Sequence, residues 1–134
     1  FRHVELADVP VASVTAAVSI ERDRLQQVLV NILLNAADAV RDREGGRVWM
    51  GVTLTDESVE LSCRDNGPGF TPVALERALE PFFTTKEPGH GTGLGLATSL
   101  QMVEAAGGQL ELSNTPDGGA LVVVRLPRLL GASE

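Results

Sequence analysis

The sequence is poor in cysteine and in positive charge. Cys63 is the only cysteine among 134 residues, so the chain can form no internal disulfide, and we expect a reducing compartment, the cytoplasm, with Cys63 as a small buried apolar side chain. The formal net charge of −7 argues against the basic surface with which proteins bind nucleic acid nonspecifically. A protein this acidic that binds a polyanion must use local dipoles and a cation instead.

Long apolar runs are also missing. None approaches the roughly 18 residues that cross a bilayer, and the first residues lack the basic-then-apolar pattern of a signal peptide. The chain has no initiator methionine, which indicates a fragment, and a membrane anchor of the parent protein in the inner membrane would leave no trace here. The length and the 43% of hydrophobic residues predict one globular domain over residues 1–134, monomeric in isolation.

The hydrophobic periodicity predicts helices interleaved with strands. Its strongest signal is a helix over residues 21–43, which Gly45 and Gly46 end. We further expect strands at residues 9–20, 47–55, 58–64, 109–113 and 120–126, helices at 71–80 and 93–106, an irregular connection at 81–91, and a frayed tail over 128–134. This order favours a two-layer α/β (α+β) sandwich, in which helices cover one face of a mixed, mostly antiparallel sheet.

A polar stripe runs along the predicted helix 21–43. Gln27, Asn31, Asn35 and Asp38 lie three or four residues apart and therefore share one side of the helix. Asparagine is unfavourable inside helices, so two asparagines one turn apart in a leucine-rich run indicate a function. The plain alternative is a solvated helix face.

Glycines gather in two loops, where they allow the backbone to approach a ligand closely. Gly67 and Gly69 form the first group, and Gly91, Gly93 and Gly95 lead directly into a predicted helix. Free N–H groups and the positive dipole end at such a helix start suit a phosphate chain. Close helix packing also selects glycine, so this loop alone is a weak signal.

Four motifs follow one another along the chain: NILLNA at 31–36, DNGPG at 65–69, PFFTTK at 81–86 and GTGLGL at 91–96. They resemble the N, G1, F and G2 boxes of histidine kinases. The resemblance covers about residues 10–127, and it identifies the chain as similar to the ATP-binding catalytic domain of a sensor histidine kinase, within the group shared with gyrase and mismatch-repair ATPases. It implies the Bergerat ATP-binding fold with ATP and Mg²⁺ as ligands. The compact segment 81–96 resembles the nitrogen-regulation and dicarboxylate-sensing subgroup.

The resemblance also implies roles for the nucleotide base. Asp65 would accept a hydrogen bond from the adenine amino group, where guanine presents a carbonyl oxygen and leaves both acceptors unsatisfied. Gly67 and Gly69 would let the loop pass close to the base. Phe82 or Phe83 would flank the pocket, with simple core packing as the alternative.

For the phosphates, the resemblance makes Asn35 the magnesium ligand and Asn31 its support one turn away. Lys86 and the backbone of residues 93–96 would neutralise the triphosphate. Many relatives carry a basic residue at Asp38, so part of the usual phosphate contact is replaced here, and Lys86 is the candidate to compensate. Asn31 and Lys86 are thus the predicted catalytic residues. The predicted nucleotide-binding residues are Asn31, Asn35, Asp38, Asp65, Gly67, Gly69, Phe82, Phe83, Thr84, Thr85, Lys86, Gly91, Thr92, Gly93, Leu94, Gly95 and Leu96.

The chain offers no credible nucleophile of its own, because neither His3 nor His90 has the acidic-flanked helical setting of the family's phosphoacceptor. The resemblance therefore implies a half-site that passes the γ-phosphate to a histidine on dimerisation helices of the same parent kinase, upstream of a response regulator. An ATP hydrolase would carry a glutamate base where this chain has Asn31, and an amide takes no proton from water. Asp38 keeps that alternative open. A serine kinase that acts on an anti-sigma antagonist uses similar motifs, and only the identity of the phosphoacceptor would distinguish it. A noncatalytic nucleotide-sensing module would usually have lost a motif residue.

Overall fold

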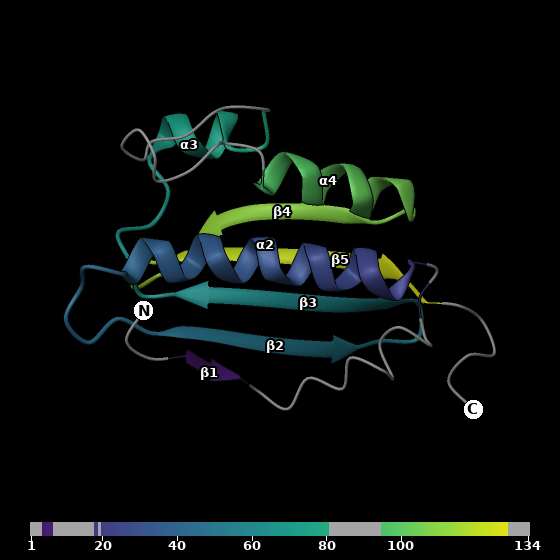
Figure 1. The fold of residues 1–134 in the computed structure, drawn as a ribbon, viewed down its shortest axis with the longest axis horizontal. Helices are drawn as coiled ribbons and strands as arrows, with labels where there is room; N and C mark the ends of the chain where they lie inside the picture. The colour runs from purple at the N-terminus through teal and green to yellow at the C-terminus, as the bar shows by residue number, and fades with distance from the viewer. Residues whose placement is uncertain (1–3, 7–17, 19, 81–94, 129–134) are drawn as a thin grey trace.

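The structure is a computed structural model that describes residues 4–6, 18, 20–80 and 95–128. Its strands are β1 (Val4–Leu6), β2 (Val48–Leu54), β3 (Ser58–Asp65), β4 (Gln109–Asn114) and β5 (Ala120–Pro127), and its helices are α2 (Arg22–Val40), α3 (Pro72–Arg77) and α4 (Gly95–Ala105). The strands form one sheet in the order β1-β2-β3-β5-β4 (Figure 1). No helix within the described residues is long and apolar enough to cross a membrane.

The sheet is mixed and mostly antiparallel, as predicted. β1 pairs with β2 in parallel, and β2–β3, β3–β5 and β4–β5 are all antiparallel. A hairpin joins β2 to β3 and is closed by the hydrogen bond from Thr55 N–H to the Ser58 carbonyl at 2.9 Å.

Helices α2 and α4 contact each other and pack on the sheet, α2 mainly on β3 and α4 on β4 (Figure 1). Every second residue of the two central strands is buried beneath them, which confirms the two-layer arrangement. Cys63 belongs to this buried set, and burial raises the pKa of its thiol to about 12. It is therefore the inert apolar side chain that the sequence predicts.

The strongest predicted helix is confirmed as α2, and its apolar stripe faces the core. Leu25, Val28 and Val40 are fully buried on that side, whereas Leu34 is 59% exposed on the other. The helix stops at Val40, three residues before the predicted end. The chain turns there because Gly46 folds back against the helix, so closely that a Cβ on Gly46 would lie 2.7 Å from the Val40 carbonyl oxygen.

The N-terminal prediction is only partly testable. Of the predicted strand 9–20, Val18 and Ile20 are described, and Val18 forms an isolated antiparallel bridge with Arg128. The strand that does pair with β2 is β1, with Val4 opposite Val48. Three residues in a long-range parallel pairing carry too little local pattern to be predicted.

The predicted frayed tail is wrong at its first residue. The backbone N–H of Arg128 donates to the Glu57 carbonyl at 2.9 Å, and its guanidinium donates to the Thr55 carbonyl at 2.8 Å. Arg128 therefore ties the end of β5 to the β2–β3 turn. The rest of the predicted tail, residues 129–134, lies outside the described residues.

Helix α3 begins as predicted and ends early, at Arg77 rather than near Glu80. The Thr71 side chain caps it by accepting a hydrogen bond from Ala74 N–H at 3.1 Å, and Pro72 occupies the first turn.

Removing this cap should loosen α3 measurably. We expect Thr71→Ala to cost about 1 kcal/mol of local stability, so that the amide of Ala74 exchanges about fivefold faster in hydrogen-exchange NMR. Thr71→Ser keeps the accepting oxygen and is the matched control. Equal exchange rates in the two variants would show that the cap does not hold the helix.

Candidate functional site

Two segments that the sequence singles out lie against helix α2: the loop after β3 and the first turn of α4. Gly67 lies so close to α2 that a Cβ there would meet the Ala39 carbonyl at 2.9 Å. Gly95, the first residue of α4, is joined to α2 by a hydrogen bond from Asn31. In Figure 1, α2 runs along the sheet with its C-terminal end near the end of β3, and α4 starts alongside the middle of α2. The fold thus brings Gly95 to Asn31 and Gly67 to the C-terminal turn of the same helix.

Asp65 is the last residue of β3, one residue beyond the predicted strand end. Alternation along the strand turns its side chain toward the helices, where it is 4% exposed. Its Oδ1 accepts hydrogen bonds from Gly67 N–H at 2.8 Å and from Ala120 N–H at 3.3 Å. The described residues provide no hydrogen bond to Oδ2, which leaves that oxygen to accept from a ligand.

The pKa of Asp65 is raised from its ordinary value because burial disfavours the carboxylate. The hydrogen bonds from Gly67 and Ala120 and the charge of Arg43 act in the opposite direction. Asp65 is therefore a buried acceptor held in place by backbone donors.

The loop after Asp65 is anchored to the α2–β2 connection through Asn66. The Asn66 side chain accepts from Arg47 N–H at 2.7 Å and donates to the Gly45 carbonyl at 3.0 Å. Its backbone N–H donates to the Arg47 carbonyl, and its own carbonyl accepts from Arg43. The sequence analysis gives Asn66 no role, yet these bonds fix where the loop leaves the sheet.

The other side of the loop is fixed by the end of β4. Asn114 accepts from Phe70 N–H at 2.7 Å and donates to the Phe70 carbonyl at 2.9 Å. Gly69 has φ +77° and lies against the β4–β5 turn, so a side chain there would be strained and would meet the Gly118 carbonyl. A Cβ on Gly119 would overlap the Asp65 carbonyl at 1.9 Å. The β4–β5 turn thus supports the loop from behind.

The predicted polar stripe on α2 faces α4 at Asn31. The Asn31 amide nitrogen donates to the Gly95 carbonyl and to Ser99 Oγ, both at 3.3 Å, and its Oδ1 accepts from Gln27 at 2.8 Å. Gln27 itself is exposed. Part of the stripe is therefore an interhelical contact rather than a solvated face.

The C-terminal part of the stripe is half-buried. Asn35 lies one turn beyond Asn31, and Asp38 lies one turn further, where it pairs with Arg41 at 2.8 Å. Asp38 is thus held in an ion pair with the residue that follows its helix.

Nowhere in the described residues do three or more His, Cys, Asp or Glu side chains converge to hold a metal ion. A cation here would depend on amide and ligand oxygens.

Several predicted residues cannot be placed. Phe82, Phe83, Thr84, Thr85, Lys86, Gly91, Thr92, Gly93 and Leu94 lie outside the described residues. Leu96 is described, and its side chain is part of the hydrophobic core. A contact of Leu96 with phosphate is therefore restricted to its backbone.

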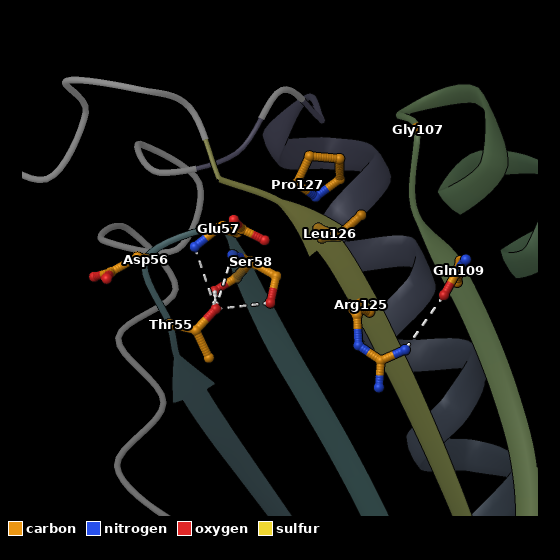
Figure 2. A pocket seen from close by; sticks show the side chains of 9 residues that line it. All are labelled: Thr55, Asp56, Glu57, Ser58, Gly107, Gln109, Arg125, Leu126 and Pro127. Atoms are coloured by element: carbon orange, nitrogen blue, oxygen red, sulfur yellow. Dashed lines mark hydrogen bonds between the residues drawn. The ribbon is translucent and has the colours of Figure 1, made fainter.

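A separate hollow of about 600 Å³ lies at the opposite end of the sheet, around the β2–β3 turn and the end of β5 (Figure 2). Its arginine, Arg125, is paired with Glu60 at 2.7 Å and with Glu111 at 3.1 Å. Both carboxylates neutralise this guanidinium, and the acidic side chains of Asp56 and Glu57 also line the hollow, which disfavours binding of a polyanion. Asp65 at the other end of β3 remains the better candidate.

Comparison with known proteins shows the family to which the chain is similar. Residues 20–130 match the family described as histidine kinase-, DNA gyrase B- and HSP90-like ATPases. The C4-dicarboxylate transport sensor protein DctB of Pseudomonas aeruginosa is 44% identical over 122 residues, which are 90% of this chain and 20% of that protein. The two-component sensor PprA of the same organism is 43% identical over 131 residues, 94% of this chain and 14% of that protein. The chain thus spans a fifth or less of the length of these relatives.

Among solved structures, the nucleotide-free catalytic domain of the histidine kinase ThkA superposes with a TM-score of 0.75 at 28% identity, over 94% of this chain and 78% of that domain. Full-length ShkA in complex with AMPPNP superposes with a TM-score of 0.70 at 31% identity, over 93% of this chain and 26% of that one.

Proposed function

Because the chain belongs to the family of histidine kinase-, DNA gyrase B- and HSP90-like ATPases, we propose that it is the ATP-binding catalytic domain of a sensor histidine kinase. It binds Mg·ATP and transfers the γ-phosphate to a histidine on separate dimerisation helices of the same parent kinase. A response regulator then receives the phosphate from the parent. The dicarboxylate sensor and the NtrY-like kinases among its relatives suggest the nitrogen-regulation and dicarboxylate-sensing subgroup.

The observation that carries the proposal is the setting of Asp65. A buried carboxylate with one oxygen occupied by two backbone N–H groups offers its other oxygen to a donor. The exocyclic amino group of adenine is such a donor, whereas guanine presents a carbonyl oxygen at that position. The AMPPNP complex of ShkA, an adenine nucleotide complex of a similar fold, supports the same base.

The amides of α2 fit a magnesium ion that arrives with its nucleotide. Mg²⁺ prefers oxygen ligands and usually takes one or two from the protein, with phosphate oxygens and water completing the octahedron. Asn35 would provide the protein oxygen through its half-buried side-chain carbonyl. The ion would neutralise part of the phosphate charge, together with Lys86, in a chain whose net charge is −7.

The phosphates would lie at the start of α4, whose first N–H groups have no partner within the helix. Lys86 and the glycines of the 91–95 segment are proposed to complete this site, with Phe82 or Phe83 beside the base. In phosphoryl transfer the protein mainly positions groups and stabilises charge. These residues would do so without forming a covalent bond to the phosphate.

The environment of Asn31 favours a kinase over a hydrolase. A hydrolase needs a base beside the attacking water, and Asn31 is an amide whose nitrogen donates to α4. Asp38, the alternative base on this helix, is paired with Arg41. The nucleophile would then come from the phosphoacceptor helices.

Labelled ATP tests the proposal directly. The chain is mixed with Mg²⁺ and the dimerisation helices of a related sensor kinase, and the phosphorylated product is treated with acid and with base. We expect a product that is lost in acid and survives base, as phosphohistidine does. An acid-stable product would indicate a serine kinase, and free phosphate released without helices would indicate a hydrolase. Failure of the chain to bind ATP would refute the proposed function.

A further inference from the structure

The described residues contain one fully buried polar side chain that the nucleotide site does not explain, Ser99, which is 0% exposed in the middle of α4. Serine in a helix commonly bonds the carbonyl four residues earlier and needs no further partner. Here Ser99 Oγ accepts a hydrogen bond from the Asn31 amide nitrogen at 3.3 Å, from a residue 68 positions away. The hydroxyl therefore serves a contact between helices.

The Asn31 amide reaches two acceptors one turn apart on α4. Its nitrogen donates to the Gly95 carbonyl and to Ser99 Oγ, which uses both of its hydrogens. On the other side, Oδ1 accepts from Gln27 and keeps capacity for a second donor. The side chain is thus held at both ends and turned with its donors toward α4.

This contact fixes how α4 lies along α2. Gly95 is the first residue of α4, and Asn35 lies one turn after Asn31 on α2. A slide of α4 along its axis would break the bonds to Gly95 and Ser99 together. The contact therefore sets the distance from the Asn35 side chain to the first N–H groups of α4.

We infer that Ser99 is a positioning residue for phosphoryl transfer, holding the Asn31 amide so that α4 presents its N-terminus in register with Asn35. The inference rests on the proposed function, since the register matters only if the metal-bound phosphates lie between these two elements. Ser99 acts through its hydrogen bond with Asn31 and is not proposed to contact the metal ion or the phosphates. Its effect should appear in transfer, for which the γ-phosphate must be aligned, more than in binding of the base.

The test compares Ser99→Ala with Thr98→Ala, which removes a hydroxyl from the neighbouring, half-buried position of the same helix. In Ser99→Ala we expect phosphoryl transfer from saturating ATP to slow by about 3- to 10-fold, the loss associated with one hydrogen bond, with ADP affinity changed by less than about twofold. Thr98→Ala should leave both quantities near those of the wild type. An unchanged rate in Ser99→Ala, an equal loss of ADP affinity, or an equal slowing in Thr98→Ala would overturn the inference.

A spectroscopic readout separates this inference from the proposed function. The side-chain amide protons of Asn31 give their own signals in a ¹⁵N–¹H spectrum of the nucleotide-free chain. We expect Ser99→Ala to shift them and to increase their exchange with water, and Thr98→Ala to leave them in place. Signals that do not move in Ser99→Ala refute the contact and with it the inference. A wild-type chain that shows the contact and transfers no phosphate refutes the proposed function and leaves only the contact between the helices standing.

Discussion

Asn35→Ala should abolish magnesium-dependent nucleotide binding. The side-chain carbonyl of Asn35 is the protein oxygen proposed for the cation, and alanine leaves phosphate and water oxygens only. The cation would then no longer link the triphosphate to the acidic chain. We expect the affinity for ATP in the presence of Mg²⁺ to fall about 100-fold or more, measured by calorimetric titration. The much weaker binding measured in EDTA should be nearly the same in wild type and variant.

Leu34→Ala is the matched control, because it truncates the preceding side chain, which points to solvent at 59% exposure. It should bind Mg·ATP as the wild type does, and both variants should unfold at similar urea concentrations. Normal magnesium-dependent affinity in Asn35→Ala would show that Asn35 is not the magnesium ligand. A loss that persists equally in EDTA would assign Asn35 to packing instead.

Asp65→Asn should weaken ATP binding by about 10- to 100-fold while leaving the fold intact. The hydrogen bonds from Gly67 and Ala120 both reach Oδ1, so the amide oxygen of asparagine can keep them. The amide nitrogen then takes the place of Oδ2 and points a donor at the adenine amino group. Two facing donors cost about 1–3 kcal/mol for each group left unpaired. The preference for ATP over GTP should fall in the same titrations, because guanine offers an acceptor there.

The stability of this variant should depend less on pH. Burial raises the pKa of Asp65 above its ordinary 3.8, so the folded protein holds the proton more tightly than the unfolded chain. The contribution of Asp65 to stability is therefore greatest below pH 3.8 and declines as the pH rises through the raised pKa. Asp65→Asn removes this decline, so its unfolding free energy near pH 7 should equal or exceed that of the wild type. The affinity of the wild type for ATP should change in the opposite direction to this stability contribution. It should fall at low pH, where the Asp65 carboxylate becomes protonated.

Asp56→Asn provides the control, since it removes the same charge from the exposed turn at the far end of the hairpin. It should leave ATP affinity unchanged. Unaltered ATP affinity in Asp65→Asn would show that Asp65 does not contact the base. A marked loss of stability near pH 7 would show that its charge supports the fold.

Local patterns in the sequence predict much of this fold. The apolar spacing of α2 and the alternation in β2 and β3 predict these elements to within a few residues, because burial on one face imposes a period on the sequence. The same alternation explains the correction at Asp65. Counting on from Cys63 turns Asp65 toward the helices, although its neighbours Asn66 and Gly67 suggest a loop.

Contacts between distant residues could not be predicted in this way. Asn31 and Ser99 are separated by 68 positions, and Asn114 and Phe70 by 44. A buried serine and an asparagine at a strand end look ordinary in sequence, since both types also serve local turns and caps. Their partners are set by how the helices and the sheet pack, which periodicity does not report.

The two hairpin turns of the sheet differ in what they permit a protein engineer to change. At the β4–β5 turn, Gly119 lies against the Asp65 carbonyl with no room for a Cβ, so extra residues or bulky labels there would disturb the loop that follows β3. The β2–β3 turn, with exposed Asp56 and Glu57, lies at the far end of β3. A fluorophore or an affinity tag attached to the exposed Asp56 would lie at the opposite end of β3 from Asp65, whereas inserted residues would disturb the hydrogen bonds from Arg128 to Thr55 and Glu57.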